Sequence, residues 1–221
     1  MEGGAKKILL HICCAPCSIY TLKKLRAEGA FVSGYFYNPN IHPYTEFLKR
    51  LQTLENYSKI SLLPLIVDKS YNLETFLKGI LEYGKDRCLF CYRTRLEKVF
   101  QKGSDEGFDA VTTTLLYSKY QRHDDIKAIG EELSNKYNID FLYEDFRKGW
   151  KVGVEESKTI NMYRQQYCGC ISVSYTHLRA HETPEHLVCR LLLEKNKRIK
   201  GFLIKNMDQH LDHVTPIKQL I

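Results

Sequence analysis

Short apolar runs alternate along the chain with stretches whose apolar residues recur at helical spacing. The apolar runs are bounded by Gly, Pro or polar turns, and they predict strands at 6–12, 30–38, 63–68, 109–116 and 139–144. The stretches between and after them predict helices at 18–29, 43–60, 72–84, 88–107, 119–138 and 153–170. This alternation predicts an α/β fold, with a parallel sheet that carries helices on both faces.

The order of elements also predicts where a ligand would lie. In open α/β sheets, ligands bind beyond the carboxyl ends of the strands. Cys13, Cys14 and Cys17 come directly after the first predicted strand, and residues 115–123, "LLYSKYQRH", leave the end of the fourth. We therefore expect these two stretches to face the same crevice.

Composition narrows the class of protein. The chain has 221 residues, 43% of them hydrophobic and 27% charged, which suits one globular domain with a substantial core. No apolar run approaches the roughly 20 residues of a membrane helix, and the first residues, "MEGGAKK", are polar, so we expect a cytoplasmic protein without a membrane segment. Thiols are kept reduced there, which favours metal or redox chemistry over structural disulfides. The formal net charge of +7 permits nucleic-acid binding without requiring it.

The last part of the chain differs in character from the rest. Residues 173–196, "VSYTHLRAHETPEHLVCRLLLEKN", resemble the translation of a sequencing adapter of the transposase type. We therefore interpret residues 1–172 as one α/β metallo-domain and residues 173–221 as an artefactual or chimeric tail. Cys189 falls in this tail and is excluded from any site.

The remaining seven cysteines form three groups, and none stands alone. The groups are Cys13, Cys14 and Cys17; Cys88 and Cys91; and Cys168 and Cys170. In "CLFC" two sulfurs lie three positions apart, so on a helix or turn they point the same way. Such a pair is the usual half of a zinc or iron–sulfur site, and the thiols after the first strand complete a shell of four.

The other two groups allow more than one interpretation. In "YCGC", Gly169 could supply the backbone angles of a small, easily reduced disulfide ring between Cys168 and Cys170, but the same pair could also bind a metal. "CAPC", between a strand and a helix, is also typical of a thioredoxin-like thiol–disulfide oxidoreductase. That interpretation leaves the extra Cys14 and the other two groups without a role.

Five motifs together resemble the epoxyqueuosine reductases of the QueH type. They are "LLHICCAPCS", "CLFCYRTRLEKV", "TTTLLYSKYQRHDDI", "DFRKGW" and "YRQQYCGC", which span about Lys7 to Ile171. The resemblance implies a fold of the PP-loop or Rossmann-like type. It also implies the last step of queuosine formation, in which the epoxide of epoxyqueuosine in tRNA is reduced without cobalamin.

The same resemblance implies a [4Fe–4S] cluster with a further metal, expected to be an iron ion, beside it. Carried onto this chain, it assigns the cluster to Cys13, Cys14, Cys88 and Cys91. Cys17 takes a position where many relatives have an acidic residue, and it is assigned to the adjacent iron. Cys168 and Cys170 would be the redox-active catalytic pair, and an external electron donor, which the sequence does not specify, would complete the cycle.

The tRNA substrate adds a requirement for contacts to RNA. Unstacked bases of RNA loops are held by aromatic rings and Arg planes. Residues beside "CLFC" and after the fourth strand offer such groups, and the candidates are Tyr92, Arg93, Tyr120, Arg122 and His123.

Two rival functions make different predictions. A zinc-binding module for RNA or protein would be colourless and free of iron. A thioredoxin-like oxidoreductase would act on model disulfides. An ATP-dependent tRNA thiolase of the PP-loop type is excluded at its key motif, because "CCAPCS" stands where a Gly/Ser-rich ATP loop is required.

Overall fold

A five-stranded parallel sheet forms the centre of the protein, in a computed structural model that describes residues 5–170. The strands lie in the order β3-β2-β1-β4-β5. Their bounds are β1 Lys7–His11, β2 Phe31–Phe36, β3 Leu65–Val67, β4 Ala110–Thr113 and β5 Asp140–Phe141. In the central register Ile8 of β1 pairs with Val32 of β2 on one side and with Ala110 of β4 on the other.

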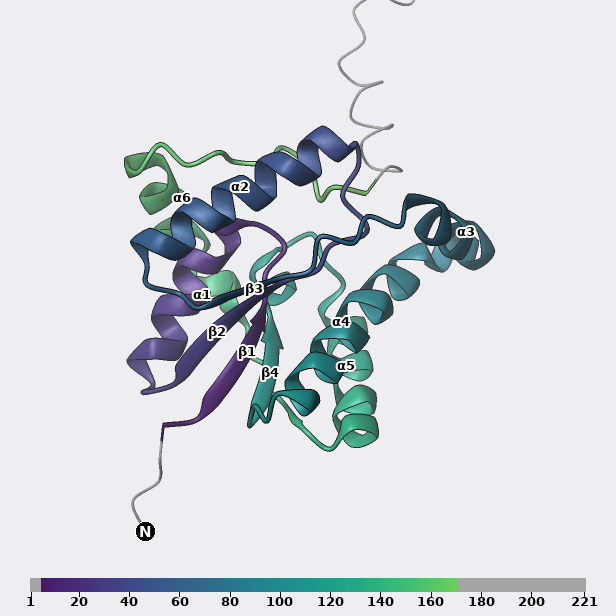
Figure 1. Ribbon diagram of the computed structural model, residues 1–221, viewed down its shortest axis with the longest axis horizontal. Coiled ribbons are helices and arrows are strands. Elements are labelled where there is room, and N and C mark those ends of the chain that lie inside the picture. The colour runs from purple at the N-terminus through teal and green to yellow at the C-terminus, as the bar shows by residue number, and fades with distance from the viewer. Residues whose placement is uncertain (1–4, 171–221) are drawn as a thin grey trace, which may run out of the picture. The chain divides into compact units, whose positions relative to one another are not determined.

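Residues 5–170 form six α-helices, which lie on the two sides of this sheet. They are α1 Ala15–Ala27, α2 Tyr44–Ile60, α3 Leu73–Tyr83, α4 Arg87–Asp105, α5 His123–Tyr137 and α6 Trp150–Thr159. Helices α1, α2 and α6 lie on one side, and α3, α4 and α5 on the other (Figure 1). Short 3₁₀ turns at Gly84–Asp86, Thr114–Tyr117 and Phe146–Gly149 complete the chain. The predicted parallel sheet with helices on both faces is confirmed.

The core lies where the central strands meet the inner sides of these helices. Leu9 of β1, Leu96 of α4 and Val111 of β4 are each fully buried. Because β1 is covered on both faces, four of its five residues are buried, as expected for a central parallel strand.

The strand order fixes the place of the ligand site. The chain runs outward from β1 through β2 to β3 and then returns to place β4 on the other side of β1. The carboxyl ends of β1 and β4 therefore border the point where the order reverses, which is where ligands bind in such sheets. Cys13 and Cys14 follow β1, and Thr114 follows β4.

Most helix and strand predictions agree with the structure within a few residues, but the last helix is wrong. α6 ends at Thr159, and residues 160–170 are irregular. Cys168 and Cys170 are therefore not helical, and Gly169 between them has a φ of +100°, outside the range of any right-handed helix. The fifth predicted helix also starts late, at His123, because residues 119–121 form a turn and a bend. The fourth predicted strand ends early, at Thr113, because residues Thr114–Tyr117 form a 3₁₀ turn that the Thr113 hydroxyl caps by accepting from the Leu115 amide at 3.1 Å.

The predicted tail at residues 173–221 lies outside the described residues. Within residues 5–170, no helix has the length and apolar character needed to cross a membrane.

Candidate metal and redox centre

Three sulfurs meet at the carboxyl end of β1. The Sγ atoms of Cys13, Cys14 and Cys17 all lie within 4.8 Å of one another. The Sγ atom of Cys14 is 3.7 Å from that of Cys13 and 2.7 Å from that of Cys17. Neighbouring residues can share this site because Cys14 is extended, with φ −166° and ψ 151°, as the N-cap of α1. Cys17 then reaches the same point from the first turn of the helix.

Polar groups from two other segments close around this triad. The Thr114 hydroxyl accepts from the Cys13 amide at 3.1 Å and lies 3.3 Å from its sulfur. The side-chain amide of Gln165 donates to the Cys14 sulfur at 2.7 Å. The contact from Thr114 brings the chain directly after β4 against the first cysteine group. Gln165 was not identified from sequence, and only its place beside the "YCGC" motif could have suggested it.

The three thiols differ in pKa. Hydrogen bonds from Cys14 and Cys17 hold the pKa of Cys13 well below its usual value. Burial raises the pKa of Cys14, and the hydrogen bonds within the triad raise that of Cys17. Cys13 is therefore the thiol of the group that loses its proton most readily. A thiolate supported by thiol neighbours is the form in which cysteine binds a metal.

The second cysteine pair lies at the start of α4. Cys88 is half-buried and Cys91 is buried, in the first two turns of the helix. Burial raises the pKa of Cys91 to about 12, and the charges of Cys170, Cys168 and Cys88 act in the same direction. The third cysteine group therefore lies within electrostatic reach of the second, although about 80 residues separate them in sequence.

The irregular segment that carries the third group is fastened by α2 and the loop before it. The two terminal nitrogens of Arg50 donate to the carbonyl oxygens of Cys168, at 3.2 Å, and Tyr167, at 2.8 Å. The His42 amide donates to the Gly169 oxygen at 2.8 Å, and the Tyr167 hydroxyl donates to the His42 oxygen at 2.5 Å. Cys168 is the more exposed residue of the pair and Cys170 is half-buried, although burial still raises the pKa of the Cys168 thiol.

Two buried arginines lie among the three groups, and sequence reasoning assigned neither of them to the cysteine centre. Arg50 is 2% exposed and Arg95 is 3% exposed. The charge of Arg50 acts on Cys14, Cys13 and Cys168, and that of Arg95 acts on Cys91, Cys13 and Cys168. Each guanidinium thus lies within electrostatic reach of thiols from separate parts of the sequence.

Comparison with known proteins identifies the family. Residues 8–175 match the sequence profile described as "Epoxyqueuosine reductase QueH". The chain is 33% identical over 180 residues to the epoxyqueuosine reductase QueH of Dehalococcoides mccartyi, covering 81% of this chain and 99% of that protein. It is 35% identical over 184 residues to the Staphylococcus epidermidis enzyme of the same name, covering 77% of each. The chain belongs to the epoxyqueuosine reductase QueH family.

A third QueH relative, from Thermotoga maritima, is 33% identical over 174 residues, covering 74% of this chain and 88% of that protein. Among solved structures, a predicted subunit of tRNA methyltransferase from Methanocaldococcus jannaschii aligns with a TM-score of 0.48 and 14% identity, over 69% of this chain and 74% of that one. That likeness is too distant to bear on activity.

In this QueH family member the predicted RNA-contacting residues separate into two sets. Tyr92 is 3% exposed, and its hydroxyl donates to Gln121 at 2.9 Å and accepts from the Arg122 amide at 3.2 Å. His123 is buried beside the Ser118 carbonyl, at 3.2 Å, and Arg93 pairs with Glu132 across α4 and α5. Tyr120 and Arg122 are the two candidates exposed to solvent, and the Arg122 guanidinium pairs with Asp125 and Asp86.

The cysteine triad of this reductase fits a metal. Two thiolates at tetrahedral positions on one metal, with bonds of about 2.3 Å, have sulfurs about 3.8 Å apart. The separation of 3.7 Å between the Cys13 and Cys14 sulfurs matches this spacing. The Cys14 and Cys17 sulfurs, at 2.7 Å, would have to separate by about 1 Å to bind the same ion.

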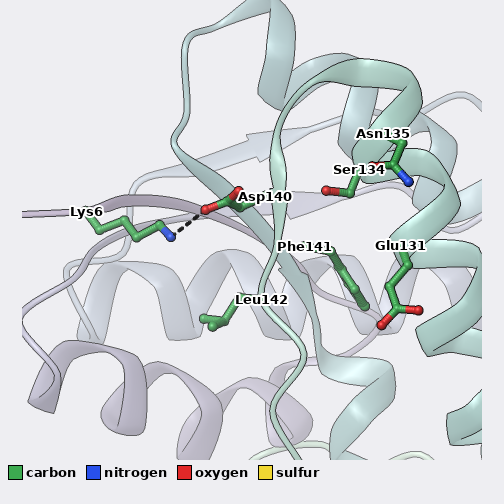
Figure 2. A pocket seen from close by; sticks show the side chains of 7 residues that line it. All are labelled: Lys6, Glu131, Ser134, Asn135, Asp140, Phe141 and Leu142. Atoms are coloured by element: carbon green, nitrogen blue, oxygen red, sulfur yellow. Dashed lines mark hydrogen bonds and ion pairs between the residues drawn. The ribbon is translucent and has the colours of Figure 1, made fainter.

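The open cavity in Figure 2 lies away from this centre. Its volume is about 590 Å³, and its lining includes Lys6, Asp140 and Phe141 with residues of α5. Lys6 precedes β1 and Asp140 begins β5, so the cavity lies at the amino ends of the strands, whereas the cysteines follow their carboxyl ends. No thiol lines it, and we assign it to the scaffold.

Proposed function

We propose that this chain reduces epoxyqueuosine to queuosine in tRNA, at a centre built from all three cysteine groups. The observation that carries the proposal is their convergence around Arg50 and Arg95, in a chain that belongs to the QueH family. Scattered core cysteines would not gather in this way at the topological switch point of the sheet.

A [4Fe–4S] cluster held by Cys13, Cys14, Cys88 and Cys91 is the arrangement we propose. Each thiolate of such a cluster binds a different iron, so the Cys13 and Cys14 sulfurs would have to move further apart than the 3.7 Å that suits a single ion. The buried, positively charged surroundings support the proposed arrangement, because a cluster with four thiolate ligands carries net negative charge. Cys17 is proposed as a ligand of an additional iron ion, and its contact with Cys14 supports a position next to the cluster. When bound, such a group supplies single electrons, and an iron with an open position supplies a Lewis acid.

Cys168 and Cys170 are proposed as the dithiol of the reaction. Converting an epoxide to an alkene breaks two C–O bonds, consumes two electrons and two protons, and releases water. Oxidising two thiols to a disulfide forms one S–S bond and yields two electrons and two protons, so the two half-reactions balance. The exposed position of Cys168 supports access for the substrate and for the external donor that restores the dithiol.

A surface beside the cysteine centre offers contacts for the tRNA loop. The Tyr120 side chain is 81% exposed and Trp150 is 42% exposed. The Lys119 ammonium lies 5.1 Å from the ring centroid of Tyr120 and 5.4 Å from the ring of Trp150. Exposed rings with a cation between them can stack a base and attract a phosphate. The Tyr117 hydroxyl donates to the Trp150 oxygen at 3.0 Å. Burial and the nearby Cys17 and Cys14 raise the pKa of Tyr117, and this influence supports a position of the surface beside the triad.

Replacing Cys88 with Ser tests the proposal. We expect wild-type protein purified without oxygen to contain iron and sulfide and to convert epoxyqueuosine in tRNA, and we expect Cys88→Ser to lose both properties. Normal turnover by Cys88→Ser contradicts the ligand assignment. Colourless, iron-free wild-type protein supports the zinc module instead, and turnover of model disulfides without conversion of tRNA supports the thioredoxin-like function.

A further inference from the structure

One face of α4 carries a buried positive charge together with two thiols. Cys88, Cys91 and Arg95 are spaced i, i+3 and i+7, so they lie on the same side of the helix. The Arg95 Nε donates to the Cys91 carbonyl oxygen at 3.1 Å, and its guanidinium lies 5.9 Å from the ring centroid of Tyr92. The side chain is almost completely shielded from solvent, at 3% exposure.

No carboxylate pairs with this guanidinium anywhere in residues 5–170. Arg50, the other buried arginine of the centre, is different because its Nε lies 2.7 Å from a Glu46 carboxylate oxygen. Burying a charge without a partner costs several kcal/mol, so proteins seldom retain one. The position of Arg95 therefore indicates that its counter-charge is something other than Asp or Glu.

The groups around Arg95 indicate what that counter-charge is. Its charge interacts with Cys91, Cys13 and Cys168, one thiol from each of the three cysteine groups, and with the Tyr92 hydroxyl. Thiols become anionic when they bind a metal. A thiolate-ligated iron–sulfur centre would bring the negative charge that the polypeptide alone does not provide.

We propose that Arg95 is the fixed counter-charge of the cysteine centre, holding its anionic form in the pocket and raising its reduction potential. The inference rests on the proposed function. A centre with thiolate ligands gains negative charge when it accepts an electron, so a neighbouring cation stabilises the reduced form more than the oxidised form. Arg95 acts here through the centre and is a positioning residue, because nothing places it against the substrate.

Arg95 could also serve only the structure, through its bond to the Cys91 carbonyl and its contact with Tyr92, and two substitutions separate the roles. Arg95→Met removes the charge and keeps most of the apolar stem. Arg95→Lys keeps the charge and loses the Nε–H that donates to Cys91. Arg93→Met is the matched control, because Arg93 lies two residues away on the same helix but pairs with Glu132 at the surface.

The experiment measures iron and sulfide per chain and the midpoint potential of each protein, prepared without oxygen. At a fixed solution potential we expect Arg95→Met to reduce the ratio of reduced to oxidised centre about tenfold, which for one electron is about 59 mV. Iron content should fall as well. Arg95→Lys should remain near the wild-type potential, and Arg93→Met should match wild type in both measurements.

Two results overturn the inference. One is an iron-loaded Arg95→Met protein with the wild-type potential, and the other is Arg95→Lys behaving like Arg95→Met, which would make the role purely structural. If Arg95→Met does not fold, the midpoint potentials of Arg95→Lys and wild type still show whether the charge or the Nε–H hydrogen bond of Arg95 matters. Iron-free wild-type protein refutes the proposed function itself, which is a different outcome.

Discussion

The ion pair between Glu46 and Arg50 fastens the segment that carries Cys168 and Cys170, so its removal should be costly. The Arg50 Nε lies 2.7 Å from Glu46 Oε1, and the two side chains are only 2% and 9% exposed. The other two nitrogens of Arg50 hold the carbonyls of Tyr167 and Cys168. The Tyr163 hydroxyl also donates to Glu46, at 2.5 Å. Glu46→Gln keeps the shape of the side chain but leaves the guanidinium without its counter-charge.

The structure allows the magnitude to be worked out. Removing one partner of a buried ion pair costs about 3–5 kcal/mol, because the remaining charge stays buried. Gln retains an acceptor for Arg50, so the lower end, about 3 kcal/mol, is expected. At about 2–4 °C per kcal/mol for a chain of this size, the melting temperature should fall by roughly 6–12 °C.

Lys24 and Glu28 provide the matched control. They have the same i, i+4 spacing on a helix and an N–O distance of 2.6 Å, but their side chains are 35% and 50% exposed. An exposed helical pair contributes about 0.3–0.5 kcal/mol, so Glu28→Gln should lower the melting temperature by only about 1–2 °C.

Thermal unfolding of the anaerobic protein, followed by circular dichroism, measures both variants. Alkylation of Cys168, measured by mass spectrometry relative to Cys88, reports the local effect. We expect Glu46→Gln to accelerate labelling of Cys168, because Arg50 no longer holds the segment in place. Equal shifts in melting temperature for Glu46→Gln and Glu28→Gln would refute the reasoning.

Three further predictions concern pH, RNA binding and the tail. Burial lowers the pKa of His42 below 6.5 in the folded protein, so the unfolded chain binds more protons and stability should fall as the pH drops below 6.5. His42→Gln should make the melting temperature less dependent on pH over that range. The dependence that remains should come from His11, whose pKa burial lowers to about 4. Trp150→Ala should raise the KM for tRNA about 5- to 150-fold, from the loss of about 1–3 kcal/mol of base stacking, with little change in kcat, and equal effects of Tyr44→Ala, at another exposed ring, would contradict this. Deleting residues 176–221, beyond the family match at 8–175, should leave iron content per chain unchanged, and loss of iron would show that the tail contributes to the domain.

Local sequence determined the architecture of the domain. The apolar runs around Leu9, Val32 and Val111 form neighbouring strands of the parallel sheet, because only strands buried on both faces are apolar at successive positions. Gly29 was predicted to end the first helix and has a φ of +80°, a conformation that favours glycine. The cysteine groups were also identified from spacing alone, because a pair at i, i+3 has a fixed mutual direction in a helix.

Sequence patterns did not determine the segment after α6 or the charges around the thiols. Residues 160–170 have enough helical character to predict a helix, yet Arg50 and His42 bind the carbonyls of residues 167–169 and impose an irregular path. Those contacts span more than a hundred residues of sequence, so no local pattern reports them.

The family and the three thiol groups could thus be predicted from residue type and spacing, which are local properties of the chain. The burial of Arg50 and Arg95 and the inaccessibility of Tyr92 and His123 were decided only by the tertiary structure. The physical reason is that solvation and charge pairing depend on which distant segments exclude water from a side chain, and an Arg has the same sequence signature at the surface as beside a thiolate.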